Sequence, residues 1–104
     1  MKAIINGKRF DTDKANLLAE VSHGYSGDFH RYEEALYQTP RSGAYFLAGE
    51  GGPRSRYAIS DRPGEWRSGQ KITPLTADEA MRWAEEHGLT DLLEAHFSDR
   101  IEDA

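Results

Sequence analysis

Two runs of residues that suit a pleated surface, separated by a turn signal, constrain the fold of this chain most strongly. Residues 32–39 and 44–48 are rich in tyrosine, leucine and phenylalanine, and they flank the turn-forming segment 40–43. A helix over 29–39 would also gather apolar side chains on one face, so the first run alone does not distinguish a helix from a strand. Because a second run follows the turn, we favour a strand and predict a central β-hairpin over 32–48.

Shorter strands are predicted on both sides of this hairpin. In residues 2–10, Asn6-Gly7 suits a turn with positive φ between two strands, although a single bent strand is the alternative. Residues 70–75 form another short run, and Pro74 places it at a sheet edge or ends it there. The sheet is therefore expected to be small and antiparallel.

A helix is predicted over residues 13–22. Residues 11–13 (Asp-Thr-Asp) offer N-cap oxygens, and His23-Gly24 can end the helix. Apolar residues recur in between at spacings of one, three and four: Leu17, Leu18 and Val21. This spacing is typical of an amphipathic helix.

Two further helices are predicted near the C-terminus. Thr76 and Glu79 stand three residues apart before an apolar pattern, which is the signature of a capping box opening a helix over 76–87. Thr90 is the expected N-cap of a second helix, over 90–101, whose leucines and phenylalanine recur at helical spacing.

Glycine and proline interrupt the middle of the chain. The segment 49–53 (Gly-Glu-Gly-Gly-Pro) is expected to break the preceding strand. Residues 55–60 suit either one helical turn or a short strand. Residues 61–69 are expected to form a loop that carries Trp66.

These elements predict a single α+β domain in which a small antiparallel sheet, centred on the hairpin 32–48, packs against about three helices. Hydrophobic residues make up only 38% of the 104 residues, so one small core is expected. Its predicted members are Phe10, Leu17, Leu18, Val21, Leu36, Phe46, Ile72, Leu75, Trp83, Leu92, Leu93 and Phe97.

Charge is divided unevenly along the chain. Residues 72–104 hold nine carboxylates against two arginines, a net charge of −7. Residues 41–71 carry a net charge of +3, and residues 1–40 carry −1. Such a division favours partners that are recognised through electrostatics, and it assigns no chemistry.

Several classes of protein are disfavoured by the composition. The absence of cysteine excludes a disulfide scaffold and a thiolate metal site. The apolar start, residues 1–5, is too short for a signal peptide or a membrane span, so a soluble cytoplasmic protein without membrane contact is expected. His87 and His96 lie on apolar helix faces, where a half-buried, hydrogen-bonded histidine is the ordinary interpretation. No metal ligand set and no cofactor site is predicted.

No catalytic motif is recognised. The glycines of 49–53 follow a strand, but neither the lysine nor the long helix of a phosphate-binding loop comes after them, so a wide turn is the favoured interpretation. Ser22, Ser26 and Ser60 lack the strained nucleophile elbow of a serine hydrolase. Glu33 and Glu34 are adjacent on the predicted strand and face opposite sides, so they would not share a proton. A non-enzymatic protein is expected.

The C-terminal carboxylates are the first candidate site. On the two predicted helices they are either an ordinary solvated face or a carboxylate-rich surface that enters the basic groove of a nucleic-acid-handling protein and takes phosphate positions. The residues predicted to bind such a partner are Asp78, Glu79, Glu85, Glu86, Asp91 and Glu94.

The basic stretch 41–71 is the alternative. Its arginines are interleaved with aromatic residues, a composition found in proteins that bind single-stranded nucleic acid. The candidate anion-binding residues are Arg41, Arg54, Arg56 and Arg67. An isoelectric point near 5.3 is far from that of a nucleic-acid-binding domain. Pairing of this stretch with the acidic helices is the ordinary interpretation, and direct nucleic-acid binding is not expected.

Three segments carry a resemblance to a family. The stretches INGKRFDT, EEALYQTPRSGAYFLAGEGGP and ITPLTADEAMRWAEEH, within residues 4–12, 33–53 and 72–87, resemble a set of small uncharacterised proteins carried on bacterial plasmids, integrative elements and prophages. The resemblance implies a mobile-element accessory protein and transfers no chemistry to particular residues. Small, acidic, cysteine-free proteins of this provenance often look like anti-CRISPR proteins, so the implied partner is a Cas effector protein or complex.

Overall fold

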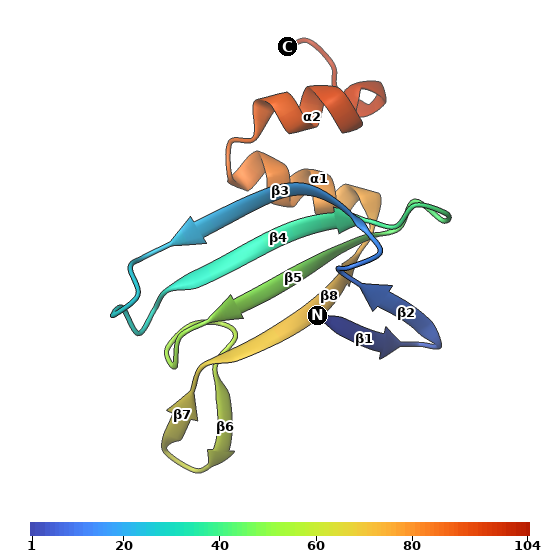
Figure 1. The fold of residues 1–104 in the computed structure, drawn as a ribbon. Coiled ribbons are helices and arrows are strands. Elements are labelled where there is room, and N and C mark those ends of the chain that lie inside the picture. Colours follow the sequence, from blue (N-terminus) through green and yellow to red (C-terminus); the bar gives the residue numbers. More distant parts are fainter.

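The computed structural model describes residues 1–104 and is built mainly of antiparallel strands, with two α-helices near the C-terminus (Figure 1). The fold mixes sheet and helix as expected, but strands dominate, and there are two helices instead of about three. The elements are β1 Lys2–Ile5, β2 Lys8–Asp11, β3 Asn16–His23, β4 Tyr32–Gln38, β5 Tyr45–Gly51, β6 Ile59–Arg62, β7 Glu65–Arg67, β8 Gly69–Leu75, α1 Ala77–Glu86, α2 Thr90–His96 and a 3-10 turn at Ser98–Arg100.

Four of the strands form the central sheet, in the order β3-β4-β5-β8. β4 and β5 pair along their whole length, from Tyr32 opposite Gly51 to Gln38 opposite Tyr45. This confirms the central hairpin and the strand interpretation of its first half. β8 is an outer strand, as Pro74 indicates, because proline is tolerated at a sheet edge.

Two small hairpins flank the sheet (Figure 1). β1 and β2 form the predicted N-terminal hairpin, with φ of 52° at Asn6 and 76° at Gly7. β6 and β7 form a second hairpin, so the prediction of a loop over 61–69 is wrong. Its turn holds Gly64 at a φ of 79°, and Trp66 is 60% exposed. Because its side chains are exposed, this hairpin has no apolar alternation to reveal it.

The prediction of a helix over residues 13–22 is also wrong, because this segment forms most of β3. The pairing of β3 with β4 shifts register between Leu17 and Ala19, which marks a β-bulge. Leu18, Ala19 and Val21 all pack toward the helices, whereas Leu17 is 49% exposed. A bulge interrupts the period-two alternation of a strand, and the resulting spacing imitates a helix.

The glycine stretch does not break β5, as the sequence suggested, because the strand continues to Gly51. The following segment, 52–58, folds back toward the sheet. A Cβ atom on Gly49 would lie 2.0 Å from Cζ of Tyr57, so only glycine lets the Tyr57 ring lie against this strand. The stretch therefore serves close packing between the strand and the returning segment.

The helices follow the prediction in part. Thr76 is the N-cap of α1, and its reciprocal bonds with Glu79 confirm the capping box. α2 is shorter than the predicted helix over 90–101 and continues only as a 3-10 turn. Its N-cap is Leu89, without a side-chain hydrogen bond, so the predicted cap at Thr90 is wrong.

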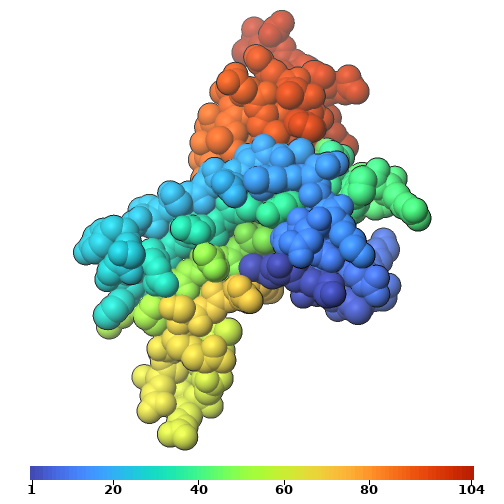
Figure 2. Space-filling view, in the orientation of Figure 1, coloured from blue at the N-terminus to red at the C-terminus, as the bar shows by residue number.

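Apolar side chains pack on both faces of the sheet. On the helical side the buried cluster comprises Leu36, Leu47, Ala80, Trp83, Ala84 and Phe97. On the other side Phe10 of the N-terminal hairpin packs with Phe46 and Ile72. The rest of this second face, here called the open face, has no helix over it (Figures 1 and 2).

Six of the twelve predicted core residues are buried: Phe10, Leu36, Phe46, Ile72, Trp83 and Phe97. Five are half-buried, namely Leu18, Val21, Leu75, Leu92 and Leu93, and only Leu17 is exposed. Prediction missed the buried Leu47, Tyr57, Ala80 and Ala84. His96 is exposed, against the half-buried position expected for it.

Candidate interaction surface

The helical layer stands out from the sheet as a lobe (Figure 2) and carries all the carboxylates predicted to bind a partner. α1 holds four of them, Asp78, Glu79, Glu85 and Glu86, and α2 holds the other two, Asp91 and Glu94. All six residues are exposed. The structure thus places them on one layer of the molecule, although they differ in their contacts.

Two of the six have partners within the chain. The guanidinium of Arg100 donates a hydrogen bond to Oδ1 of Asp78 and ties the C-terminal segment to the first turn of α1. Glu79 accepts a hydrogen bond of 2.9 Å from the backbone N–H of Thr76. That backbone bond, helped by the Thr76 side chain, holds the pKa of Glu79 below its usual range. These two carboxylates therefore have structural roles at the start of α1.

The other four carboxylates, Glu85, Glu86, Asp91 and Glu94, make no ion pair, and we call them the helical acidic surface. Glu85 and Glu94 also line a groove of about 380 Å³ between α1, α2 and residues 100–102. These exposed charges are free to meet a positively charged partner.

The arginines of the basic stretch do not gather on one surface. Arg41 lies in the turn between β4 and β5, whereas Arg54 and Arg56 lie in the segment beyond the other end of β5. Arg67, in β7, bonds to Asp61 at 2.8 Å. No ion pair joins the stretch 41–71 to the helices, so the prediction that these regions neutralise each other is wrong.

Glu34 of β4 is a buried carboxylate. Prediction treated it only as the neighbour of Glu33 and missed its burial and its partners. It is 3% exposed and points toward the helices. Its Oε2 accepts hydrogen bonds from the Tyr57 hydroxyl and, at 3.3 Å, from Arg56. Its Oε1 accepts the indole N–H of Trp83 at 3.0 Å and lies 3.7 Å from Nε2 of His87. We call these five residues the Glu34 cluster.

The Glu34 cluster joins three separate parts of the fold: the sheet, the segment 52–58 and α1. Burial, together with the hydrogen bond to Glu34 and its charge, raises the pKa of Tyr57, so this hydroxyl stays a donor. No buried side-chain polar atom lacks a partner. We therefore interpret the Glu34 cluster as a structural hydrogen-bond network in which every buried polar group has a partner. Strand alternation was the available signal, because it places Glu34 on the same face as the core residue Leu36.

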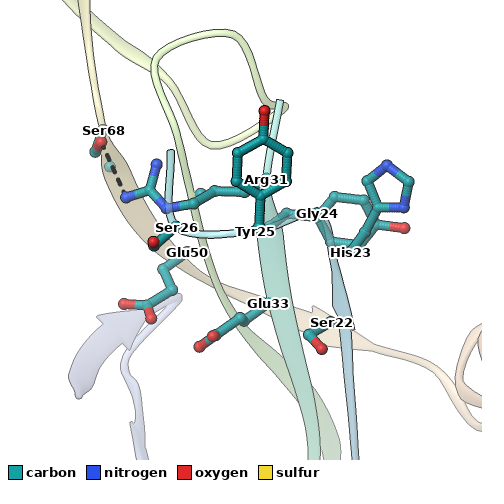
Figure 3. A pocket seen from close by; sticks show the side chains of 12 residues that line it. Ser22, His23, Gly24, Tyr25, Ser26, Arg31, Glu33, Glu50 and Ser68 are labelled. Carbon is teal, nitrogen blue, oxygen red and sulfur yellow. Dashed lines mark hydrogen bonds between the residues drawn. The ribbon is translucent and has the colours of Figure 1, made fainter. Parts of the chain in front are cut away.

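Adjacent Glu33 faces the open side, so the expected opposite orientation of the two glutamates is confirmed. It lines a polar pocket of about 280 Å³, where the turn after β3 meets β5 and β8 (Figure 3). A hydrogen bond with Glu33, followed by burial and the repulsion of its charge, raises the pKa of Glu50. Arg31 opposes this shift and donates to Oγ of Ser68 at 3.5 Å.

This pocket contains no nucleophile paired with a base. Ser22 and Ser26 line it, as does His23, but neither hydroxyl makes a side-chain hydrogen bond to a histidine. His23 instead stacks on Tyr32, with ring centroids 5.3 Å apart. The chain also brings together no group of three or more histidine, aspartate or glutamate side chains that could hold a metal ion.

No protein-family model, curated protein or solved structure matches this chain. None of its helices is long and apolar enough to cross a membrane.

Proposed function

We propose that this chain is a non-enzymatic binding protein that engages a basic partner through the helical acidic surface. One observation supports this most directly: Glu85, Glu86, Asp91 and Glu94 are exposed and unpaired, although the chain has thirteen lysines and arginines. Unpaired carboxylates on one lobe produce a negative potential that attracts a positively charged surface and raises its association rate.

The proposed partner is a nucleic-acid-handling protein, and more specifically a Cas effector protein or complex. Such proteins hold nucleic acid in grooves of lysine and arginine that pair with phosphates. Carboxylates on two neighbouring helices can occupy those phosphate positions and so compete with the target. The choice of a Cas effector depends on the resemblance of residues 4–12, 33–53 and 72–87 to mobile-element proteins.

Charge reversal tests this proposal. In the triple variant Glu85→Lys, Glu86→Lys and Glu94→Lys, we expect weaker capture of the Cas effector by the tagged chain and loss of inhibition in a phage-plaque assay. Residual binding should also depend less on salt, because the attraction between unlike charges is lost. Circular dichroism verifies that the fold is kept. Unchanged inhibition by this variant would remove the phosphate-mimic mechanism.

A matched control separates the effect of the helical acidic surface from the effect of the net charge of the chain. Glu20→Lys, Glu33→Lys and Glu65→Lys change the net charge equally, at exposed positions outside the helical layer. We expect this variant to bind and inhibit like the original chain. Equal weakening by both variants would mean that overall charge, and not this surface, governs binding. If the original chain inhibits no Cas effector, the proposal of a Cas effector as partner fails. The broader proposal, that the helical acidic surface binds a basic partner, is then decided by whether the chain captures other basic proteins through this surface.

Direct binding of nucleic acid is not proposed. Arg56 and Arg67 have carboxylate partners, and Arg41 lies at the opposite end of the central hairpin from Arg54. A fluorescence anisotropy titration with single-stranded DNA at low salt should therefore show no saturable binding. Tight binding that falls steeply with added salt would favour the basic stretch as the functional region.

A further inference from the structure

The groove between α1, α2 and the C-terminal segment combines an apolar floor with an acidic rim. Its volume is about 380 Å³. The apolar lining residues are Met81, Leu93 and Ile101, and the carboxylates come from Glu85, Glu94 and Glu102. Met81 and Leu93 pack against the buried helix-side cluster, so packing holds the floor in place. Ile101 is 41% exposed, which leaves apolar surface uncovered.

No cation of the chain neutralises this rim. Arg100 also lines the groove, but its guanidinium is bonded to Asp78 at the start of α1. Glu85, Glu94 and Glu102 form no ion pair. An acidic occupant would be repelled, and a neutral apolar one would remove water from the carboxylates without replacing those hydrogen bonds. Charge complementarity therefore selects an occupant with a cationic group.

We propose that the groove receives one arginine side chain of a partner protein. An arginine has an aliphatic stem that can cover the apolar floor and a charged head that can stay at the wet rim. Its planar guanidinium binds carboxylates through paired hydrogen bonds and is more weakly hydrated than the ammonium of lysine. The identity of the partner rests on the proposed function, whereas the preference of the groove for arginine can be tested on the chain alone.

The test is an NMR titration of the chain with N-acetyl-arginine amide as the probe. N-acetyl-citrulline amide is the matched control, because it has nearly the same shape without the charge. We expect saturable, millimolar shifts of the methyl signals of Met81, Leu93 and Ile101 with the arginine probe. The citrulline probe should produce no saturable shift of these signals.

Variants assign the binding to the rim and the floor. The double variant Glu85→Gln and Glu94→Gln should weaken binding of the arginine probe by roughly 2- to 30-fold, because each exposed charge pair contributes modestly. The matched variant Glu20→Gln and Glu65→Gln removes the same charge at exposed positions outside the helical layer and should bind the probe as the original chain does. Ile101→Ser, which leaves every charge in place, should also weaken binding.

The proposal is overturned if the arginine probe gives no saturable shift, if the citrulline probe binds equally, or if both double variants behave alike. Its failure can be distinguished from failure of the proposed function. A chain that binds the probe in the groove but inhibits no effector keeps the groove and loses the function. A chain that inhibits through its helical acidic surface without binding the probe supports the proposed function and contradicts the arginine-binding groove.

Discussion

Replacing Glu34 with alanine is expected to destabilise the fold more than any other single removal of a carboxylate. Glu34 is 3% exposed and accepts hydrogen bonds from Tyr57, Trp83 and Arg56, with His87 nearby. Alanine would leave the indole N–H and the phenol O–H buried without an acceptor. The four partners come from the segment 52–58 and from α1 with the residue after it, so the loss affects the contacts of both with the sheet.

The magnitude follows from the two orphaned donors. Each buried donor left without a partner costs about 1–3 kcal/mol. The ion pair with Arg56 adds little, because the Arg56 side chain is 65% exposed and solvent screens it. We therefore expect the free energy of unfolding to fall by about 2–6 kcal/mol, a large part of the about 5–15 kcal/mol typical of a small domain.

Urea unfolding followed by tryptophan fluorescence measures this loss. Trp83 lies in the cluster and Trp66 is 60% exposed, so a Trp66→Phe background makes Trp83 the single reporter. Glu33→Ala is the matched control, because it removes a carboxylate from the adjacent, exposed position of the same strand. A loss below about 1 kcal/mol for Glu34→Ala, or one equal to that of Glu33→Ala, would refute the role assigned to the cluster.

Four further changes have defined outcomes. Stability should decline as pH rises above about 10, because an unfolded tyrosine ionises before Tyr57, whose folded pKa is raised, and Tyr57→Phe should reduce this decline in urea titrations. Gly49→Ala should cost about 1–3 kcal/mol in the same assay, since its Cβ would meet the Tyr57 ring. Thr76→Ala should cost about 1 kcal/mol and reduce the helical dichroism signal, because the capping box is lost. Glu33→Gln should gain about 0.2–0.5 kcal/mol at pH 7 by relieving its repulsion of Glu50. This gain should vanish at pH 3, because Glu33 raises the pKa of Glu50 in the original chain, and pH 3 is below the ordinary pKa of a glutamate in the variant as well.

Local signals predicted the elements that depend on local contacts. The capping box at Thr76 and the turn at Asn6 involve only neighbouring residues, so their sequence patterns were sufficient. β3 depends instead on pairing with β4, and its bulge at Leu17 disguised the alternation of a strand. The expected cap at Asp11 is a turn in which the Asp11 carboxylate accepts the backbone N–H of Asp13, so an aspartate suited to a helix cap served a turn instead.

In the candidate site, too, local sequence signals predicted some features, whereas contacts between distant residues had no such signal. Exposure of the helical carboxylates follows from the amphipathic pattern, and the bonding of Glu79 follows from the capping box. The contact of Asp78 with Arg100 joins residues 22 positions apart and has no sequence signal. The Glu34 cluster spans 53 positions, from the central strand to His87, and depends on Gly49 of β5, which leaves room for the Tyr57 ring.

The Glu34 cluster also sets where the helical acidic surface stands relative to the sheet. Trp83 and His87 belong to the C-terminal half of α1 and the residue after it, and Glu85 and Glu86 lie between them. Bonds from Glu34 to this stretch therefore fix the position of the carboxylates proposed to bind a partner. Glu34→Gln keeps an acceptor for Trp83 and should leave binding intact, whereas Glu34→Ala should weaken binding without altering one exposed charge. Charge reversal changes the potential and keeps the geometry, so the two kinds of variant separate the contributions of charge and of position.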